Sequence, residues 1–181
     1  ELYQPESVRI DACLAAAGIA ADDVKTVINS HLHFDHCGQN PHFHDTDVEF
    51  VAQRAELDAV RDDPVYTDPS WALSPGRQQR AIDGDDEIAD GIRVLATPGH
   101  TVGHQSVAVD TADGLVVIAA QAVWNADELV EGRATDANIG SPALRAAATD
   151  SISRIRSLRP RTVHFSHCAS LDGRLLGRPD D

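Results

Sequence analysis

The most informative stretch of this sequence is HLHFDH, residues 31–36, which places three imidazoles and one carboxylate within six positions. Burying these polar side chains without a cation would be costly, whereas imidazole nitrogens and carboxylate oxygens are ordinary ligands of divalent metals. In an extended segment, residues two apart point to the same side, so His31 and His33 can bind one ion while Asp35 and His36 turn toward a second. The stretch therefore predicts a metal centre; a solvated, histidine-rich turn is the alternative.

Histidines also follow or end other strand-like runs. The apolar run KTVINS, residues 25–30, stops directly before His31. His100 comes just after IRVLATP, residues 92–98, and RTVHFSH, residues 161–167, ends in His167. Apolar, β-branched runs of this length are typical of strands. We therefore expect histidines from three strand ends to converge on one site.

The remaining pattern predicts a single domain, residues 1–181, of mixed α/β (α+β) class, because 181 residues is an ordinary length for one compact domain. Periodicity and turn residues predict helices over residues 5–17, 52–61 and 141–159, and further strands over residues 47–53, 104–111 and 115–120. Residues 62–76 are rich in Pro and Asp, and we expect an irregular loop there, over the site.

Composition restricts the partners. The formal net charge is −14, from 29 acidic and 15 basic side chains, which disfavours a nucleic-acid partner. No apolar run is long enough to span a membrane. The three cysteines are odd in number and widely spaced, which favours a reducing compartment, so we expect a cytoplasmic protein acting on a small molecule. The sequence does not indicate an oligomeric state.

The motif HLHFDH matches HxHxDH, the hallmark of the metallo-β-lactamase superfamily, and TPGHTVGH (97–104) and FSH (165–167) match that family's later ligand segments in order and spacing. The chain most resembles the branch of N-acyl-homoserine-lactonase-like enzymes. This resemblance implies an αββα sandwich with metals at one edge, where the sheets meet. Family members usually carry two further strands before the first helix. We expect these strands to be missing from this chain, which also has no methionine and so would be N-terminally truncated.

The resemblance also implies roles for individual residues. The first metal would be held by His31, His33 and His100, and the second by Asp35, His36 and His167. Zn²⁺ is the expected metal, as one or two ions, although other divalent metals are compatible with these ligands. We interpret His104 as a histidine that supports the ligands rather than binding metal. The remaining histidines, His42, His44 and His164, are interpreted as solvated or hydrogen-bonded.

The chain departs from the family at three positions near this site. Gln121 stands where the family has an aspartate that bridges the two metals, and an amide is a weaker bridge than a carboxylate. Trp124 stands where related lactonases carry a tyrosine, and its indole N–H can donate a hydrogen bond but cannot ionise. Cys168 follows the last histidine, where an acidic residue is common. The change at Gln121 predicts a weaker second metal site, and the three changes together predict either a divergent specificity or a weakened enzyme.

The leading functional hypothesis is hydrolysis of an ester, lactone or related acyl bond by metal-activated hydroxide, with Asp35 as the catalytic residue that moves the proton. Alternatives within the superfamily are thioester hydrolysis as in glyoxalase II, β-lactam hydrolysis and phosphodiester cleavage, the last disfavoured by the acidic charge. A different class of hypothesis is a non-catalytic metal-binding or ligand-binding protein, which Gln121 and Trp124 motivate. A third hypothesis is a structural remnant without function.

Overall fold

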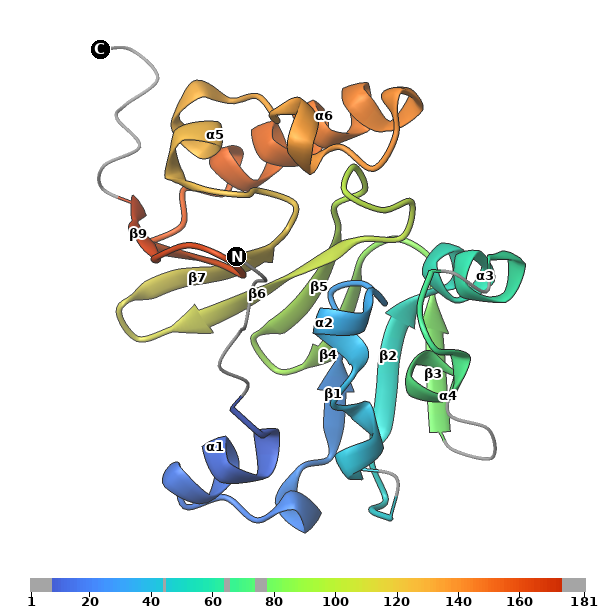
Figure 1. Ribbon diagram of the computed structural model, residues 1–181. Helices are drawn as coiled ribbons and strands as arrows, with labels where there is room; N and C mark the ends of the chain where they lie inside the picture. The colour runs from blue at the N-terminus through green and yellow to red at the C-terminus, as the bar shows by residue number, and fades with distance from the viewer. Residues whose placement is uncertain (1–7, 44, 64–65, 74–77, 174–181) are drawn as a thin grey trace, which may run out of the picture.

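The computed structural model describes residues 8–43, 45–63, 66–73 and 78–173. Two β-sheets face each other, and helices cover the outer face of each sheet (Figure 1). This is the αββα arrangement that the sequence resemblance implies, so the expected mixed α/β class is confirmed.

The smaller sheet is parallel and has the order β1-β2-β3. Its strands are β1 (Thr26–Ile28), β2 (Glu49–Gln53) and β3 (Gln78–Ile82). Three helices cover its outer face: α2 (Phe34–Cys37), α3 (Arg54–Asp62) and α4 (Pro69–Ala72). Leu57 and Val60 of α3 pack with Leu32, Ala52 and Ala72 in a buried cluster, which fixes the helices to this sheet.

The larger sheet has the order β4-β5-β6-β7-β8-β9 and is mostly antiparallel, with β7 and β8 paired in parallel. Its strands are β4 (Asp86–Ala89), β5 (Ile92–Ala96), β6 (Gln105–Thr111), β7 (Gly114–Ala120), β8 (Thr162–Phe165) and β9 (Leu171–Asp172). The helices α5 (Ala126–Glu131) and α6 (Arg145–Ser157) lie over it. Their Leu129, Ile152 and Ile155 are fully buried against Val117 and Val163 of the sheet.

The sheets are joined by an apolar cluster and by buried amides. Val51, Ile82 and Val94 pack between the sheets. Gln105, at the start of β6, donates its backbone N–H to Ser30 O at 2.8 Å and its side-chain amide to Asn29 O at 2.7 Å. The segment that carries His31 is therefore bonded directly to a central strand of the larger sheet.

Several predicted elements change their bounds. The first helix is α1 (Ile10–Ala16), and the residues predicted to begin it lie partly outside the described range. The expected extended loop at the histidine motif is wrong after His33, because residues 34–37 form the single turn of α2. The last long helix is preceded by a 3-10 turn at Pro142–Leu144. The expected irregular loop over residues 62–76 contains α4 in its described part, because Asp68 caps a turn that opens with Pro69. The other 3-10 turns are Ala21–Asp23, Asn40–Phe43 and Asp136–Asn138.

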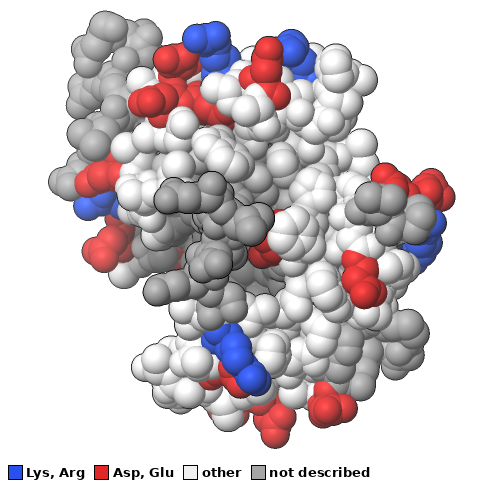
Figure 2. All heavy atoms as spheres, viewed as in Figure 1, with Lys and Arg blue, Asp and Glu red and all other residues white. Residues whose placement is uncertain are grey.

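No helix in the described ranges is both long enough and apolar enough to cross a membrane. On the face shown in Figure 2, charged side chains of both signs lie mostly around the periphery, and the described residues form no continuous basic patch there. The prediction that nucleic acid is not a partner stays a prediction.

Candidate metal centre

The histidine motif reaches the edge of the sandwich from β1. His31 and His33 lie in extended chain after this strand, and His33 precedes the first turn of α2 with φ −67° and ψ 156°. Asp35 and His36 lie within α2. His100 lies between β5 and β6, and His167 follows β8. The three strand ends named by the sequence therefore meet at one place.

His31, His33 and His100 form the first group able to hold a metal ion, with one ligand atom from each residue within 4.8 Å of the others. The His33 and His100 rings are perpendicular, and His100 Nε2 lies 3.1 Å from His33 Nδ1. The other ring nitrogen of His100, Nδ1, lies 3.2 Å from the carbonyl oxygen of Asn138. Donation to that carbonyl would leave the Nε2 lone pair facing the group, as a metal ligand requires.

Asp35, His36 and His167 form the second group, again with ligand atoms within 4.8 Å of one another. Asp35 Oδ2 lies 3.4 Å from His36 Nε2 and 3.6 Å from His167 Nε2, so the carboxylate stands between the two rings. The two groups adjoin, since the ring centroids of His31 and His36 are 4.0 Å apart.

Buried polar atoms without partners show that these residues fit a metal. Among the described residues, the buried side-chain atoms that make no hydrogen bond are His31 Nε2, His36 Nε2, Gln121 Oε1 and Asn138 Oδ1. Such atoms are rare in folded proteins and call for an explanation. His31 Nε2 belongs to the first group, and His36 Nε2 belongs to the second, where it faces the Asp35 carboxylate at 3.4 Å without forming a hydrogen bond. A cation bound at each group would satisfy these nitrogens.

Burial lowers the pKa of three of the ligand imidazoles, which favours the neutral form that binds metal. It lowers the pKa of His31 far below the ordinary value, and neighbouring histidines lower it further. The pKa of His36 is lowered to about 4, mainly by burial, although the Asp35 carboxylate opposes the shift. Burial likewise lowers the pKa of His100.

His104 is fully buried, and both its ring nitrogens have protein partners. Nδ1 lies 3.0 Å from Thr97 Oγ1, and Nε2 accepts the backbone N–H of Gln121 at 3.2 Å. These contacts agree with our interpretation that His104 supports the site, which stays a prediction. Burial lowers the pKa of His104 to about 3.

We expect the metal-free protein to lose stability as the pH falls from 7 to 5. The pKa values of buried His31, His36 and His104 are lowered on folding, so below about pH 6.5 the unfolded chain binds more protons than the folded chain. The free energy of unfolding therefore rises with pH across this window. By pH 5 each fully buried histidine should have cost about 2 kcal/mol. Urea unfolding in the presence of a chelator at pH 7 and pH 5 measures this difference; equal free energies would contradict it.

Gln121 follows Ala120, whose φ of 51° lies in the left-handed region that alanine rarely adopts. The strained turn at the end of β7 brings Gln121 beside the second group, where its backbone N–H binds His104 and its Oε1 is left without a partner. An amide occupies this position without contributing negative charge.

We expect Gln121→Asp to strengthen metal binding at the second group by roughly 100-fold, because one added negative charge beside a partly buried dication amounts to about 3 kcal/mol. Titration of the metal-free protein with Zn²⁺ measures the change. Asn125→Asp is the matched control, because it adds the same charge at the N-cap of α5, where a carboxylate also caps. Two tightly bound ions in the native chain, with affinities unchanged in Gln121→Asp, would contradict this prediction.

The other predicted residues lie around the second group or apart from it. Trp124 is 37% exposed, and its ring stacks on the His167 ring with centroids 4.9 Å apart. Cys168, which follows His167 in the sequence, is exposed. His42 and His164 are also exposed, and His164 forms a hydrogen bond with Ser170. His44 lies outside the described residues.

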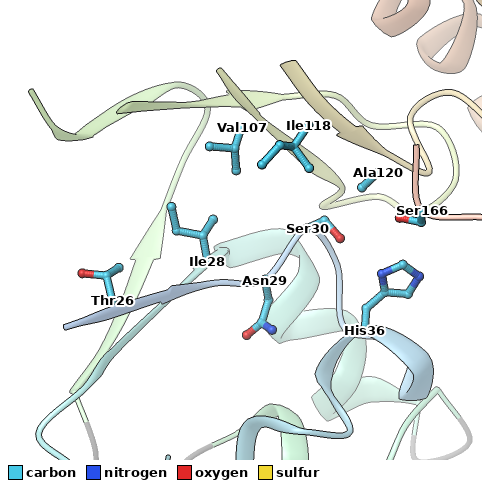
Figure 3. Close-up of a pocket in the computed structure, with 9 residues that line it drawn as sticks. All are labelled: Thr26, Ile28, Asn29, Ser30, His36, Val107, Ile118, Ala120 and Ser166. Atoms are coloured by element: carbon cyan, nitrogen blue, oxygen red, sulfur yellow. The ribbon is translucent and has the colours of Figure 1, made fainter. Parts of the chain in front are cut away.

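A pocket of about 350 Å³ extends from the second group into the space between the sheets (Figure 3). His36 and Ser166 line one end of the pocket, and Thr26, Ile28 and Val107 line the other. Ile118 of β7 also lines it and is 44% exposed. The pocket therefore reaches the second group through the His36 side chain.

Two residues that the sequence patterns do not single out, Glu56 and Asn138, form hydrogen bonds to the segments that carry the ligands. Asn138 presents its carbonyl to His100, and its side-chain N–H₂ donates to Gln121 O at 3.1 Å. Glu56 is fully buried and accepts a hydrogen bond from the backbone N–H of Leu32. A signal for Glu56 was present, because it falls among the apolar positions Leu57 and Val60 of the helix, where an acidic residue is unusual.

An αββα sandwich with two adjoining groups of His and Asp at one edge is the architecture of a metallo-hydrolase fold. The comparison with protein families agrees, because residues 2–167 match the model of the metallo-beta-lactamase superfamily. The chain belongs to this superfamily.

Within this superfamily, the chain is similar to N-acyl homoserine lactonases. An N-acyl homoserine lactonase from Bacillus cereus is 37% identical over 120 residues, which are 66% of this chain and 46% of the relative. The chain thus spans less than half the length of this curated relative. The crystal structure of a quorum-quenching N-acyl homoserine lactone lactonase has a TM-score of 0.74 at 31% identity, covering 91% of this chain and 66% of that one.

A second solved structure is informative about the site. It is an N-acyl homoserine lactone hydrolase with the product N-hexanoyl-L-homoserine bound at its catalytic metal centre. Its TM-score is 0.72 at 30% identity, covering 88% of this chain and 62% of that one. That protein, which has the same fold, therefore binds a small acyl product at its metal centre.

Proposed function

We propose that this protein is a metal-dependent hydrolase that cleaves an ester, lactone or related acyl bond in a small molecule. The observation that carries the proposal is the adjacency of the two ligand groups, which meet at His31 and His36, each with a buried ring nitrogen that makes no hydrogen bond. The lactonase relatives support the choice of an acyl bond.

In this proposal His31, His33 and His100 hold the first ion, and Asp35, His36 and His167 hold the second when it is present. A bound Zn²⁺ or similar ion supplies a Lewis acid that polarises a carbonyl and lowers the pKa of water at the site. We expect the metal to be Zn²⁺. We also expect residues 1–181 to form one domain. The expected location is the cytoplasm, which is a reducing compartment. All three cysteines are free in the structure, which is compatible with that setting.

The chain's own residues would position the substrate and move protons. Asp35 is 37% exposed at its side chain, so it can accept a proton from water and pass it to a leaving group. Trp124 borders the same group, and its indole N–H can donate to a carbonyl oxygen of the substrate. The indole cannot supply or take a proton, so Asp35 would carry the proton transfer.

The test is metal analysis of protein purified without chelator, followed by turnover of N-acyl homoserine lactones, an aryl ester and a thioester. We expect at least one bound divalent ion per chain and hydrolysis of a lactone or ester that a chelator abolishes. Metal without turnover would favour the alternative, a non-catalytic metal-binding protein, which the neutral Gln121 side chain supports. Absence of metal would contradict both.

A further inference from the structure

The carboxylate of Glu56 is fully buried and forms no ion pair with a positively charged side chain among the described residues. It lies on α3 and has no solvent exposure. Its Oε1 accepts hydrogen bonds from the backbone N–H of Leu32 at 2.9 Å and from the Tyr66 hydroxyl at 2.5 Å. Its Oε2 accepts from the Thr101 hydroxyl at 2.7 Å and from the backbone N–H of Gly103 at 3.0 Å. Four donors compensate for the burial of a charge that has no counter-ion.

These donors lie on the segments that carry the first ligand group. Leu32 lies between His31 and His33 in the chain. Thr101 directly follows His100, and Gly103 ends the same turn. The Tyr66 ring lies against the His33 ring, with centroids 4.7 Å apart. One buried side chain is therefore bonded to both loops that supply the three histidines.

The turn after His100 also lies unusually close to α3. A Cβ at position 103 would lie 2.3 Å from the backbone nitrogen of Glu56, so only glycine allows this approach. The close contact puts the Gly103 N–H within reach of a carboxylate whose own backbone is adjacent. The position of the His100 turn is thus set by α3 and not by the neighbouring strands alone.

We propose that Glu56 is a positioning residue, which holds the His31–His33 segment and the His100 turn in the arrangement that binds the first metal. This inference rests on the proposed metal site. Ligands fixed before the metal arrives bind it more tightly, because less conformational freedom is lost on binding. Glu56 would supply that order without touching the metal or the substrate.

A carboxylate is required because each of its oxygens faces a backbone N–H. In Glu56→Gln one oxygen becomes an N–H₂ group, which must face either Leu32 N–H or Gly103 N–H. Neither backbone group can accept a hydrogen bond, whereas the Tyr66 and Thr101 hydroxyls can rotate. In either orientation of the amide, the hydrogen bond from Leu32 N–H or the one from Gly103 N–H is lost, so either the His31–His33 segment or the His100 turn is no longer held by residue 56.

The experiment titrates metal-free protein with Co²⁺ and Zn²⁺, by calorimetry and by the Co²⁺ absorption spectrum. For Glu56→Gln we expect roughly a 10- to 100-fold weaker first ion and an altered Co²⁺ spectrum, the effect typical of losing a group that orients ligands. Leu57→Ala is the matched control, because Leu57 is buried on the same helix and packs in its apolar cluster. It should lower the free energy of unfolding while leaving metal affinity within about twofold.

Two milder variants keep the test decisive if Glu56→Gln does not fold. Tyr66→Phe and Thr101→Val each remove one hydroxyl donor, from Oε1 and Oε2 respectively, and should weaken the first ion about three- to tenfold. Native affinity and spectrum in all folded variants, or an equal loss of affinity in Leu57→Ala, would overturn the role of Glu56. Failure of the native chain to bind either metal would instead overturn the proposed function.

Discussion

His33→Ala is expected to abolish tight metal binding and, with it, hydrolytic turnover. His33 is one of the three residues of the first group, and two imidazoles alone do not make a complete site for Zn²⁺. The substitution should spare the fold, since His33 is only half-buried, whereas His31 is fully buried and its truncation would leave a cavity. Elemental analysis of the purified variant, with turnover of whichever substrate the native protein accepts, measures both effects.

His42→Ala is the control for this prediction, because His42 is exposed and belongs to neither ligand group. Its metal content should equal that of the native chain. Full metal content in His33→Ala would remove this residue from the site, and loss of metal in His42→Ala would mean that the site is drawn around the wrong histidines.

Asp35→Asn is expected to lower turnover by about 10²- to 10⁴-fold while changing the free energy of unfolding little. The range is the usual contribution of a positioned general acid or base, and an amide can neither take up nor release the proton. Asp35 is partly exposed and its contacts in the structure are with His36 and His167, so the fold does not depend on its charge. Steady-state kinetics at saturating metal separate the loss of proton transfer from weaker binding of the second ion.

The matched comparison for Asp35→Asn is Asp58→Asn, which removes an exposed carboxylate paired with Arg61 on the outer surface of α3. We expect native turnover there. Native turnover in Asp35→Asn, with metal content verified, would exclude Asp35 from the proton transfer.

The sequence predicted the strands that carry the site because their apolar runs are nearly continuous. The run at residues 115–120 became β7, and the run at residues 92–98 became β5. By contrast, β3 begins with Gln78, Gln79 and Arg80, which are exposed or half-buried and give no apolar period. Strand propensity reflects burial on a sheet face, so a polar edge strand is not visible in the sequence alone.

In the candidate site, too, some residues can be predicted from the sequence and others cannot. The ligand residues stand out because their type and spacing are unusual, whereas their supports depend on contacts between distant segments. Asn138 contacts His100 across 38 positions, and Glu56 contacts Gly103 across 47. No local pattern encodes such contacts, since they exist only after the two sheets and α3 have packed.

The backbone bond from Gln105 to Ser30 has a consequence for the time scale of motion. Loops that bind ligands usually belong to the least stable part of a protein and open independently of the core. Here the segment that enters the histidine motif is bonded to β6, whose Gln105 and Ser106 are completely buried. Displacement of the His31 backbone therefore requires its segment to separate from β6, so we expect this part of the site to exchange its amide protons as slowly as the larger sheet.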